Sequence, residues 1–516
     1  MSEAKLSRVE RRRKQRELRE QQKKQGKQYP PTFTLPNRKC QSDTVEEEKE
    51  DIQYTTEEQL KVYGKLLPGL LRKLAQVPDP RNPKKIKHQM RVMMFYGILM
   101  FVFQMTSRRN TNQEMTTPQL LENLKVLFPE LTEMPHQDTL CRLLEEMDVA
   151  EIETSYIDLL RKLIRKKKFQ NFLHQKRYLV AVDGTQKYVM NQCWDERYLR
   201  RKIRGKDGEY QYYTYVLEAV LILSNGMVLP LLSIFLENSA ELEAVENDEE
   251  WKQDCELKAF YRLAKRLKQE FPKLSLTLLL DGLYAKGPVM EICHKNKWEF
   301  MIVLKDKSLS TVWEEAEGLI RLDTQREYWH EQRWRGRQQT FRWANGIEYE
   351  YGIGKPKIQT IHMVTCEESW EEIDKKGDVV TKTGRHAWIS SSPISRKNIH
   401  ERCNLIARKR WLHENNILKE KHQGYNYEHI FSHNWHAMQG YHYLMHIARM
   451  LNELVLHSIS LTEQVKEVGI QKFIKNFCIV MKHREFDPKQ LWRLVESPGQ
   501  LRLAYEENWK TSRSVA

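Results

Sequence analysis

The chain has 516 residues, a length that excludes a mini-protein and allows about two to four domains. Lysine and arginine number 85 against 70 aspartates and glutamates, and the net charge of +15 favours a polyanionic partner, with nucleic acid as the leading candidate. Hydrophobic residues make up 40% of the chain, enough to bury a core, so wholesale disorder is excluded.

The eight cysteines are scattered without a CxxC pair, which predicts reduced thiols in an intracellular protein. The N-terminal segment has no apolar stretch and does not predict a secretory signal. The most apolar run, residues 92–103, is shorter than the roughly 20 residues that a membrane-spanning helix needs, so we expect a buried helix there and no membrane association.

Residues 1–55 predict a flexible arm and linker, first basic and then acidic. Eleven lysines and arginines fall within residues 1–30, with almost no apolar side chain to bury. Such a segment is either a solvated tail or an arm that becomes ordered on DNA phosphates, and the sequence leaves both interpretations open.

Residues 56–175 predict a helical N-terminal region that binds DNA, because apolar residues recur every three or four positions without a strand pattern. A basic cluster that includes Lys166 and Lys167 marks its end. This cluster is either a solvated helix face or part of the DNA-binding module.

From residue 176 the pattern changes to strand, hairpin of two strands, helix, strand, helix and strand, which is the order of an RNase H-like α/β core. Residues 224–226 (Ser-Asn-Gly) predict the hairpin turn. We expect the first part of this core in residues 176–310 and a β-rich insertion in residues 311–395. The helix that completes the core should follow in residues 396–455, and a helical C-terminal region in residues 456–516.

Two aspartates stand directly after apolar runs of strand length. Asp183 follows YLVAV and Asp281 follows LSLTLLL, and a glycine comes after each. Because open α/β sheets bind ligands at the carboxyl ends of their strands, both are candidate active-site residues. The competing interpretation is a simple Asp-Gly turn at each position.

A third group lies on the helix predicted after the insertion. At about 100° per residue, Glu414 lies about 40° from Arg410, and Lys421 returns to about 20° from Arg410, so all three project from one face. The competing interpretation is an ordinary ion-paired helix surface.

These three segments together resemble a known family. VDGTQ at Asp183, LLLDGLYAKG at Asp281 and ARKRWLHENNILKEKHQGY at Glu414 are similar to the three acidic motifs of insertion-sequence DDE transposases. The Arg-x3-Glu-x6-Lys spacing of Arg410, Glu414 and Lys421 is similar to that of hairpin-forming, cut-and-paste members with a β-rich insertion before the Glu.

A further stretch, QDCELKAFYRLAKRL with Asp254 and Glu256, resembles the ISNCY group of these enzymes. The sequence departs from the family pattern at Ala407, where relatives have a Tyr three residues before the Arg. The resemblance therefore does not extend to the role of that Tyr or to the hairpin step.

The resemblance implies an endonuclease that performs transposition: it cleaves the ends of an insertion sequence and joins them to target DNA. Asp183, Asp281 and Glu414 are the implied catalytic residues and ligands of two Mg²⁺ or Mn²⁺ ions, because carboxylate oxygens suit these hard cations. Arg410 and Lys421 are the implied phosphate-binding residues.

The implied partners are double-stranded DNA, as terminal inverted repeats and as target, and a second copy of the chain, so we expect a homodimer on DNA. The implied location is the cytoplasm of a prokaryotic cell, at the nucleoid.

Three other groups of residues are weaker candidates. In the insertion, Trp334 lies between Arg333 and Arg335, which suits either a packed core or the stacking of an unpaired base beside phosphates. Asp254 and Glu256 favour support of the active site or a helix cap over metal binding. The last candidate is a zinc site made of histidines, but the sequence offers no Cys or carboxylate that would complete a tetrahedral ligand set. The histidines are His429, His433, His436, His442 and His446.

Two alternative functions remain open. An RNase H-like nuclease or resolvase would cleave DNA without joining it, but such a core needs neither the insertion nor the basic helical region. A DNA-binding regulator with a decayed active site is the alternative from another class. The three intact acidic residues argue against it, and Ala407 argues mildly for it.

Overall fold

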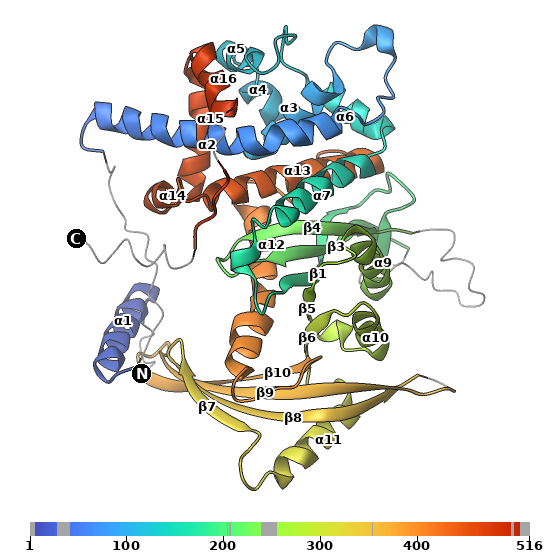
Figure 1. The fold of residues 1–516 in the computed structure, drawn as a ribbon, viewed down its shortest axis with the longest axis vertical. Coiled ribbons are helices and arrows are strands. Elements are labelled where there is room, and N and C mark those ends of the chain that lie inside the picture. The colour runs from blue at the N-terminus through green and yellow to red at the C-terminus, as the bar shows by residue number, and fades with distance from the viewer. Residues whose placement is uncertain are drawn as a thin grey trace. The chain divides into compact units, whose positions relative to one another are not determined.

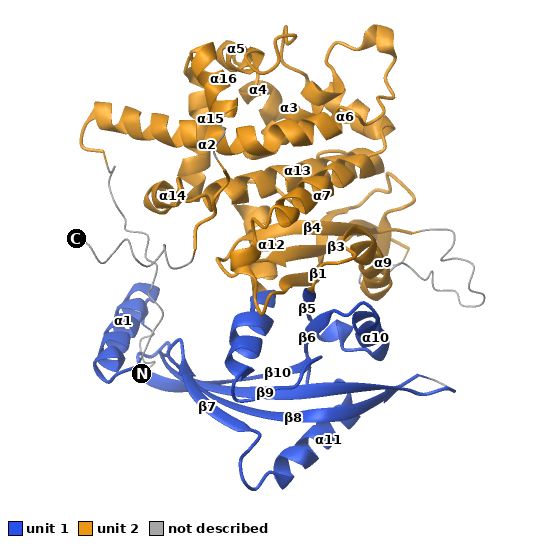
Figure 2. Ribbon diagram, viewed as in Figure 1, with its two compact units in different colours: residues 1–34, 276–410 blue, residues 35–275, 411–516 orange. Residues whose placement is uncertain are grey.

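The structure is a computed structural model that describes residues 6–27, 42–203, 205, 208–238, 255–352, 354–496 and 500–505. The chain divides into two compact units, coloured separately in Figure 2. Unit 1 comprises Met1–Thr34 and Leu276–Arg410, and unit 2 comprises Leu35–Ser275 and Trp411–Ala516. Each unit thus combines segments that are far apart in the sequence.

The helical part of unit 2 is built around α13 (Trp435–Leu456), almost all of whose side chains are buried. Figure 1 shows α2, α3 and α7 running alongside it. Between residues 42 and 172 the described elements are all helical, as the apolar periodicity predicts: α2 (Val45–Leu74), η1 (Pro83–Lys85), α3 (Met90–Val102), α4 (Arg108–Glu114), α5 (Pro118–Lys125), α6 (Gln137–Glu146), α7 (Ala150–Arg165) and η2 (Gln170–Phe172).

The C-terminal helices complete this bundle, with α15 against α2 and α5, and α16 against α2. A Cβ at Gly64 of α2 would lie 2.3 Å from the Val495 backbone oxygen of α16, so only glycine permits this approach. The helices are α14 (Thr462–Val468), α15 (Ile470–His483) and α16 (Pro488–Glu496).

The strands of unit 2 are antiparallel and are organised around β3 (Tyr210–Ile222). It pairs with β1 (Tyr178–Met190), and also with β2 (Leu199–Lys202) and β4 (Val228–Leu236). The hairpin between β3 and β4 turns at the predicted residues, where Gly226 has φ +85°. Helix α9 (Glu256–Glu270) packs on β3 and β4, and α13 also packs on β4.

Unit 1 contains a mixed sheet in the order β5-β6-β10-β9-β8-β7. Strands β5 and β6 are parallel and joined by η3 and α10, whereas the others are antiparallel. The elements are β5 (Leu276–Leu280), η3 (Gly282–Tyr284), α10 (Gly287–Lys295), β6 (Glu299–Val303), α11 (Ser310–Leu322), β7 (Trp329–Trp334), β8 (Arg337–Tyr351), β9 (Lys357–Ile373) and β10 (Val379–Ser390).

The predicted insertion is rich in strands, but it begins with α11, which packs on β8. It is also continuous with the strands before it, because Trp388 of β10 pairs with Val303 of β6. The edge of β6 is thereby hydrogen-bonded rather than exposed.

The basic N-terminal segment is helical, contrary to the expectation of a flexible arm. Helix α1 (Arg8–Lys24) begins with a capping box between Ser7 and Glu10. Its end is held within unit 1, because Lys27 forms an ion pair of 3.1 Å with Glu371 of β9. The acidic part also differs from a linker, since α2 already begins at Val45.

Within the described residues, no helix combines the length and the apolarity that crossing a membrane requires. The seven described cysteines are free thiols, in agreement with their scattered positions in the sequence.

Candidate active site

Asp183 lies inside β1 rather than at its end, which corrects the prediction. The strand continues to Met190 because the residues after Asp183 pair with Tyr212–Leu217 of β3. The side chain is half-buried, and its Oδ1 accepts a hydrogen bond of 3.0 Å from the Gly184 amide. In the register of β1 and β3, the residue directly opposite Asp183 is Glu218, which is buried.

Asp281 stands directly after β5, as the apolar run predicts. It is the N-cap of η3, and its Oδ1 accepts a hydrogen bond of 2.7 Å from the Leu283 amide, so the Asp-Gly turn is real as well. Its other oxygen lies 3.7 Å from the Lys305 ammonium, a largely exposed group. The half-buried carboxylate therefore remains accessible to solvent.

Glu414 lies on α12 (Arg410–His422) and is exposed. The helix includes Arg410 and Lys421, so the angular argument for one shared face applies. The preceding segment is not a uniform α-helix: it is a π-helix, η4 (His400–Ile406), followed by a 3₁₀ turn, η5 (Ala407–Lys409). Such π segments are frequent at functional sites.

The three carboxylates belong to two units. Asp183 and Glu414 are part of unit 2, and Asp281 is part of unit 1. Within the described residues, a different group has its metal-ligating atoms within 4.8 Å of one another: Glu218, His442 and His446.

Lys421 has contacts that the helical-face argument did not anticipate. Its ammonium lies 2.8 Å from Glu428 and 3.4 Å from the carbonyl oxygen of Gln186, three residues after Asp183 on β1. The side chain is only 16% exposed. The end of α12 is therefore attached to β1 close to Asp183.

If the chain cleaves DNA, as its resemblance implies, and Lys421 binds phosphate, Lys421→Ala should slow that cleavage more than about tenfold, or about 1.4 kcal/mol of barrier. The matched control is Lys419→Ala, which removes an exposed ammonium from the same helix. Single-turnover rates together with melting curves make the comparison. Should Glu428→Gln reproduce the defect of Lys421→Ala, the lysine serves the ion pair and not the phosphate.

Arg410 is half-buried at the first residue of α12. Ala407, where the family has Tyr, is buried at the start of η5. A tyrosine at this buried position would require its neighbours to repack. The packing around Ala407 is therefore adapted to the small side chain.

Of the two acidic residues near the start of α9, the structure describes only Glu256. Glu256 is the first residue of α9, and its Oε2 accepts a hydrogen bond of 2.9 Å from the Tyr215 hydroxyl. A Cβ at Gly184 would lie 2.7 Å from the same oxygen, so Glu256 faces the side of β1 opposite to Asp183. Asp254 lies outside the described residues.

The insertion residues form the β7–β8 turn. Arg335 and Gly336 have φ of +50° and +77°, which makes a tight two-residue turn after Trp334. The half-buried Trp334 ring contacts two guanidinium groups, with Arg335 at 4.6 Å and Arg408 at 5.4 Å from its centroid. Arg333 and Arg335 themselves are exposed.

A buried carboxylate that the sequence gave no reason to select lies next to this turn. Glu368 of β9 is completely buried and accepts hydrogen bonds from Arg408 and Arg337. Burial opposes the charged form, but hydrogen bonds from His386 and Gln339, with the charge of Arg408, lower the pKa of Glu368 to about 2. Arg408 lies in η5, so Glu368 anchors the turn that leads into α12.

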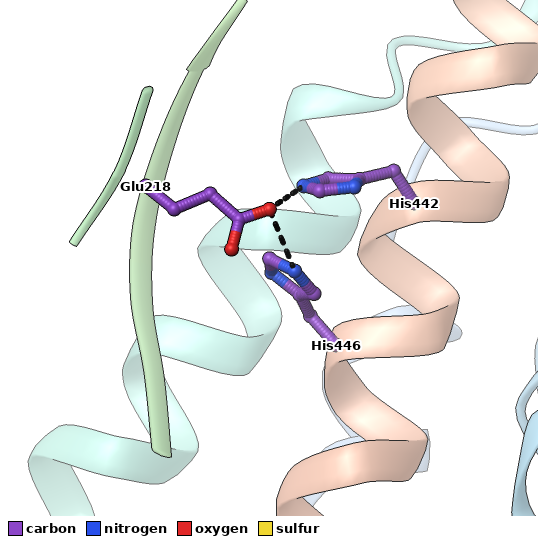
Figure 3. A group of neighbouring side chains, drawn as sticks. All are labelled: Glu218, His442 and His446. Carbon is purple, nitrogen blue, oxygen red and sulfur yellow. Dashed lines mark ion pairs between the residues drawn. The ribbon is translucent and has the colours of Figure 1, made fainter. Parts of the chain in front are cut away.

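The histidines contact different partners from those that their spacing suggests. His433 stacks on Trp194, and His436 lies 3.2 Å from Arg197. His442 and His446 instead point from α13 toward Glu218, as Figure 3 shows. The missed signal is the i, i+4 spacing of these two histidines, whose carboxylate partner is remote in sequence.

The lysines of the basic cluster at the end of α7 differ in their surroundings. Lys168 donates a hydrogen bond of 2.9 Å to the carbonyl oxygen of Leu501, whereas Lys166 and Lys167 are exposed. These two ammonium groups are accessible to a phosphate backbone.

Helix α1 also presents a basic surface. If its exposed arginines contact DNA, deletion of residues 1–28 should make the salt dependence of DNA binding shallower, by about 0.9 in the log-log slope per lost phosphate contact. Filter binding of a duplex across a salt series measures the slope. An unchanged slope would mean that α1 serves only its contact with β9.

Residues 71–160 match the family model described as DDE_Tnp_1-associated. The matched segment runs from the end of α2 into α7, within the helical part of unit 2. No curated protein matches the chain. The match is therefore to a domain associated with DDE transposases, and it concerns this helical segment of the chain.

Proposed function

We propose that the chain is a DDE transposase with an RNase H-like catalytic core, which cleaves transposon ends and joins them to target DNA by a cut-and-paste route. The observation that carries this proposal is the set of accessible carboxylates Asp183, Asp281 and Glu414, in a chain whose helical region matches a DDE-associated family. They arise from strand β1, the end of strand β5 and helix α12, respectively.

The order of elements supports the RNase H-like core. Strands β1, β3 and β4 are antiparallel neighbours, and β5 and β6 follow as a parallel pair with helices α9 and α10 between strands in the chain. Helix α12, which carries Glu414, follows the insertion.

The donor set fits hard divalent cations. All three candidates are carboxylates that solvent reaches, and oxygen ligands of this kind suit Mg²⁺ or Mn²⁺. Asp183, Asp281 and Glu414 would hold two ions, which when bound stabilise the attacking and leaving oxygens of an in-line displacement at phosphorus.

Basic residues would hold the DNA itself. Arg410 would bind a phosphate by its planar fork and Lys421 as a point charge, on the same helix as Glu414. Exposed basic groups at other sites would contact the backbone of the transposon end or the target: Lys166, Lys167, Arg333 and Arg335. We further propose a homodimer that brings two ends together at the nucleoid.

The experiment is a cleavage assay with the full chain and a duplex that carries the DNA flanking its coding region. We expect cleavage with Mg²⁺ or Mn²⁺ and none with excess EDTA, because three carboxylates alone cannot activate a phosphodiester. A pre-cleaved end and a plasmid target are then added to test joining. Cleavage without joining would indicate a nuclease or resolvase, and EDTA-resistant cleavage would contradict the proposal.

A further inference from the structure

The side chains that come closest to a metal-ligand arrangement in the described chain are not the candidate catalytic carboxylates. Glu218 projects from β3, and His442 and His446 project from one face of α13 toward it (Figure 3). Their exposed fractions are 1%, 0% and 5%, so all three ligands lie within the core of unit 2.

The distances between the polar atoms of this group decide what the three side chains can bind. Glu218 Oε1 lies 3.6 Å from His446 Nε2 and 3.9 Å from His442 Nε2. Both distances are too long for good hydrogen bonds. Ligands about 2.1 Å from a tetrahedral Zn²⁺ ion lie about 3.4 Å apart, so the observed separations are close to those of a metal site.

The cluster also leaves polar atoms unsatisfied in the part of the chain that the structure describes. Glu218 Oε2, His442 Nδ1 and His446 Nε2 are buried and have no hydrogen-bond partner. A buried polar atom without a partner loses its hydrogen bonds to water and gains none in the fold, so each such atom is destabilising. A cation between the three side chains would satisfy His446 Nε2, the one of the three facing ligand atoms that has no hydrogen-bond partner among the described residues.

We propose that Glu218, His442 and His446 form a buried structural site for a transition-metal ion, Zn²⁺ by the chemistry of its donors. Two imidazoles and one carboxylate are an established zinc ligand set, whereas Mg²⁺ prefers oxygen alone. Two hydroxyl groups already lie against the ligand atoms: Ser233 Oγ is 3.0 Å from His442 Nε2, and the Tyr427 hydroxyl donates a hydrogen bond of 2.6 Å to Glu218 Oε1. A fourth position is open to one of these oxygens or to a water.

Two titratable groups in the core of unit 2 determine the charge around this site. Burial keeps the pKa of His442 well below its usual range, so its imidazole is neutral and able to bind metal. Burial also lowers the pKa of the nearby Lys187 to about 8. A cavity of about 10 Å³ between Lys187 and His442 has room for one water.

The site would connect α13 to the strand beside Asp183. Glu218 and Asp183 are directly opposite each other in the register of β1 and β3. An ion at Glu218 would therefore fix β3 against the central helix, at the level of a proposed catalytic residue. The inference rests on the geometry of unit 2 and does not depend on the proposed function.

The test is elemental analysis of the full chain, purified without a metal-affinity step. We expect one zinc ion per chain after dialysis against Mg²⁺. Stripping the ion with a strong chelator should lower the melting temperature, and Zn²⁺ but not Mg²⁺ should restore it. Replacement by Co²⁺ should give visible ligand-field bands without thiolate charge transfer, because the site has no Cys.

Variants assign the site. His446→Ala should reduce zinc affinity at least tenfold, whereas the matched control His436→Ala removes an exposed imidazole from the same helix and should retain the metal. If the wild-type chain holds no zinc and Zn²⁺ does not shift its melting temperature, the cluster is a buried ion network balanced by Lys187 and the proposal is wrong. Full zinc retention in His446→Ala would also overturn it.

Discussion

Asp183→Asn and Glu414→Gln are each expected to slow metal-dependent cleavage of transposon-end DNA at least about a thousandfold, close to 4 kcal/mol of barrier. Each change keeps the shape of the side chain but removes the negative charge that would hold a divalent ion. Duplex affinity should remain near that of the wild type, because basic side chains and not carboxylates contact the phosphates.

The measurement combines single-turnover cleavage with gel-shift titration. Glu463→Gln is the matched control, since this exposed glutamate of α14 forms an ion pair with its helix neighbour Lys466 at 2.8 Å. It should cleave at the wild-type rate. Wild-type rates in Asp183→Asn or Glu414→Gln would remove that residue from the catalytic set.

Glu368→Ala is expected to destabilise the fold by about 3–5 kcal/mol. The substitution leaves Arg408, whose side chain is 8% exposed, without its buried partner, and an uncompensated buried charge is costly. Because Arg408 belongs to η5, the change should also loosen the start of α12, and cleavage should fall at temperatures well below the melting transition. Chemical denaturation gives the free energy of unfolding.

Glu368 should also contribute to the pH dependence of the free energy of unfolding. Its pKa is lowered to about 2 in the fold, so its contribution is present above the pKa of the unfolded state, about 4.3, and is lost as the pH falls toward 2. Glu368→Gln should therefore flatten the loss of stability between pH 5 and about 2. An unchanged acid profile would mean that other carboxylates dominate acid unfolding. Glu371→Gln, on the same strand but less buried, is the comparison.

Local patterns predicted much of the fold. The apolar run before Asp281 identified β5, and the Ser-Asn-Gly turn identified the hairpin between β3 and β4. The spacing of Arg410, Glu414 and Lys421 identified a helix that the structure contains. Each of these signals depends on neighbours within one or two turns of chain.

Where the structure differs from the sequence-based predictions, the difference has a physical cause. Gly184 suggested that β1 ends at Asp183, but pairing with β3 carries the strand to Met190. Scarcity of apolar residues suggested a flexible arm at the N-terminus, although the Ser7–Glu10 capping box is a helix signal that was present in the sequence.

Buried ionic groups were the least predictable part of the site. Glu218 and Glu368 lie in β-strands whose partners come from segments remote in sequence, α13 and η5. No periodicity marks such contacts, because they depend on how the strands and helices pack. Single charged residues within otherwise apolar strands, as in YTYVLEAVLIL, are the available clue.

The most direct test of metal-dependent transposase chemistry is a cleavage measurement on an end in which sulfur replaces the leaving 3′ oxygen. If carboxylate-held ions contact that oxygen, cleavage should be slow in Mg²⁺, which binds sulfur poorly, and should recover in Mn²⁺ relative to the unmodified end. Equal relative rates in the two metals would contradict a metal at the leaving oxygen, and with it the catalytic role assigned to Asp183, Asp281 and Glu414.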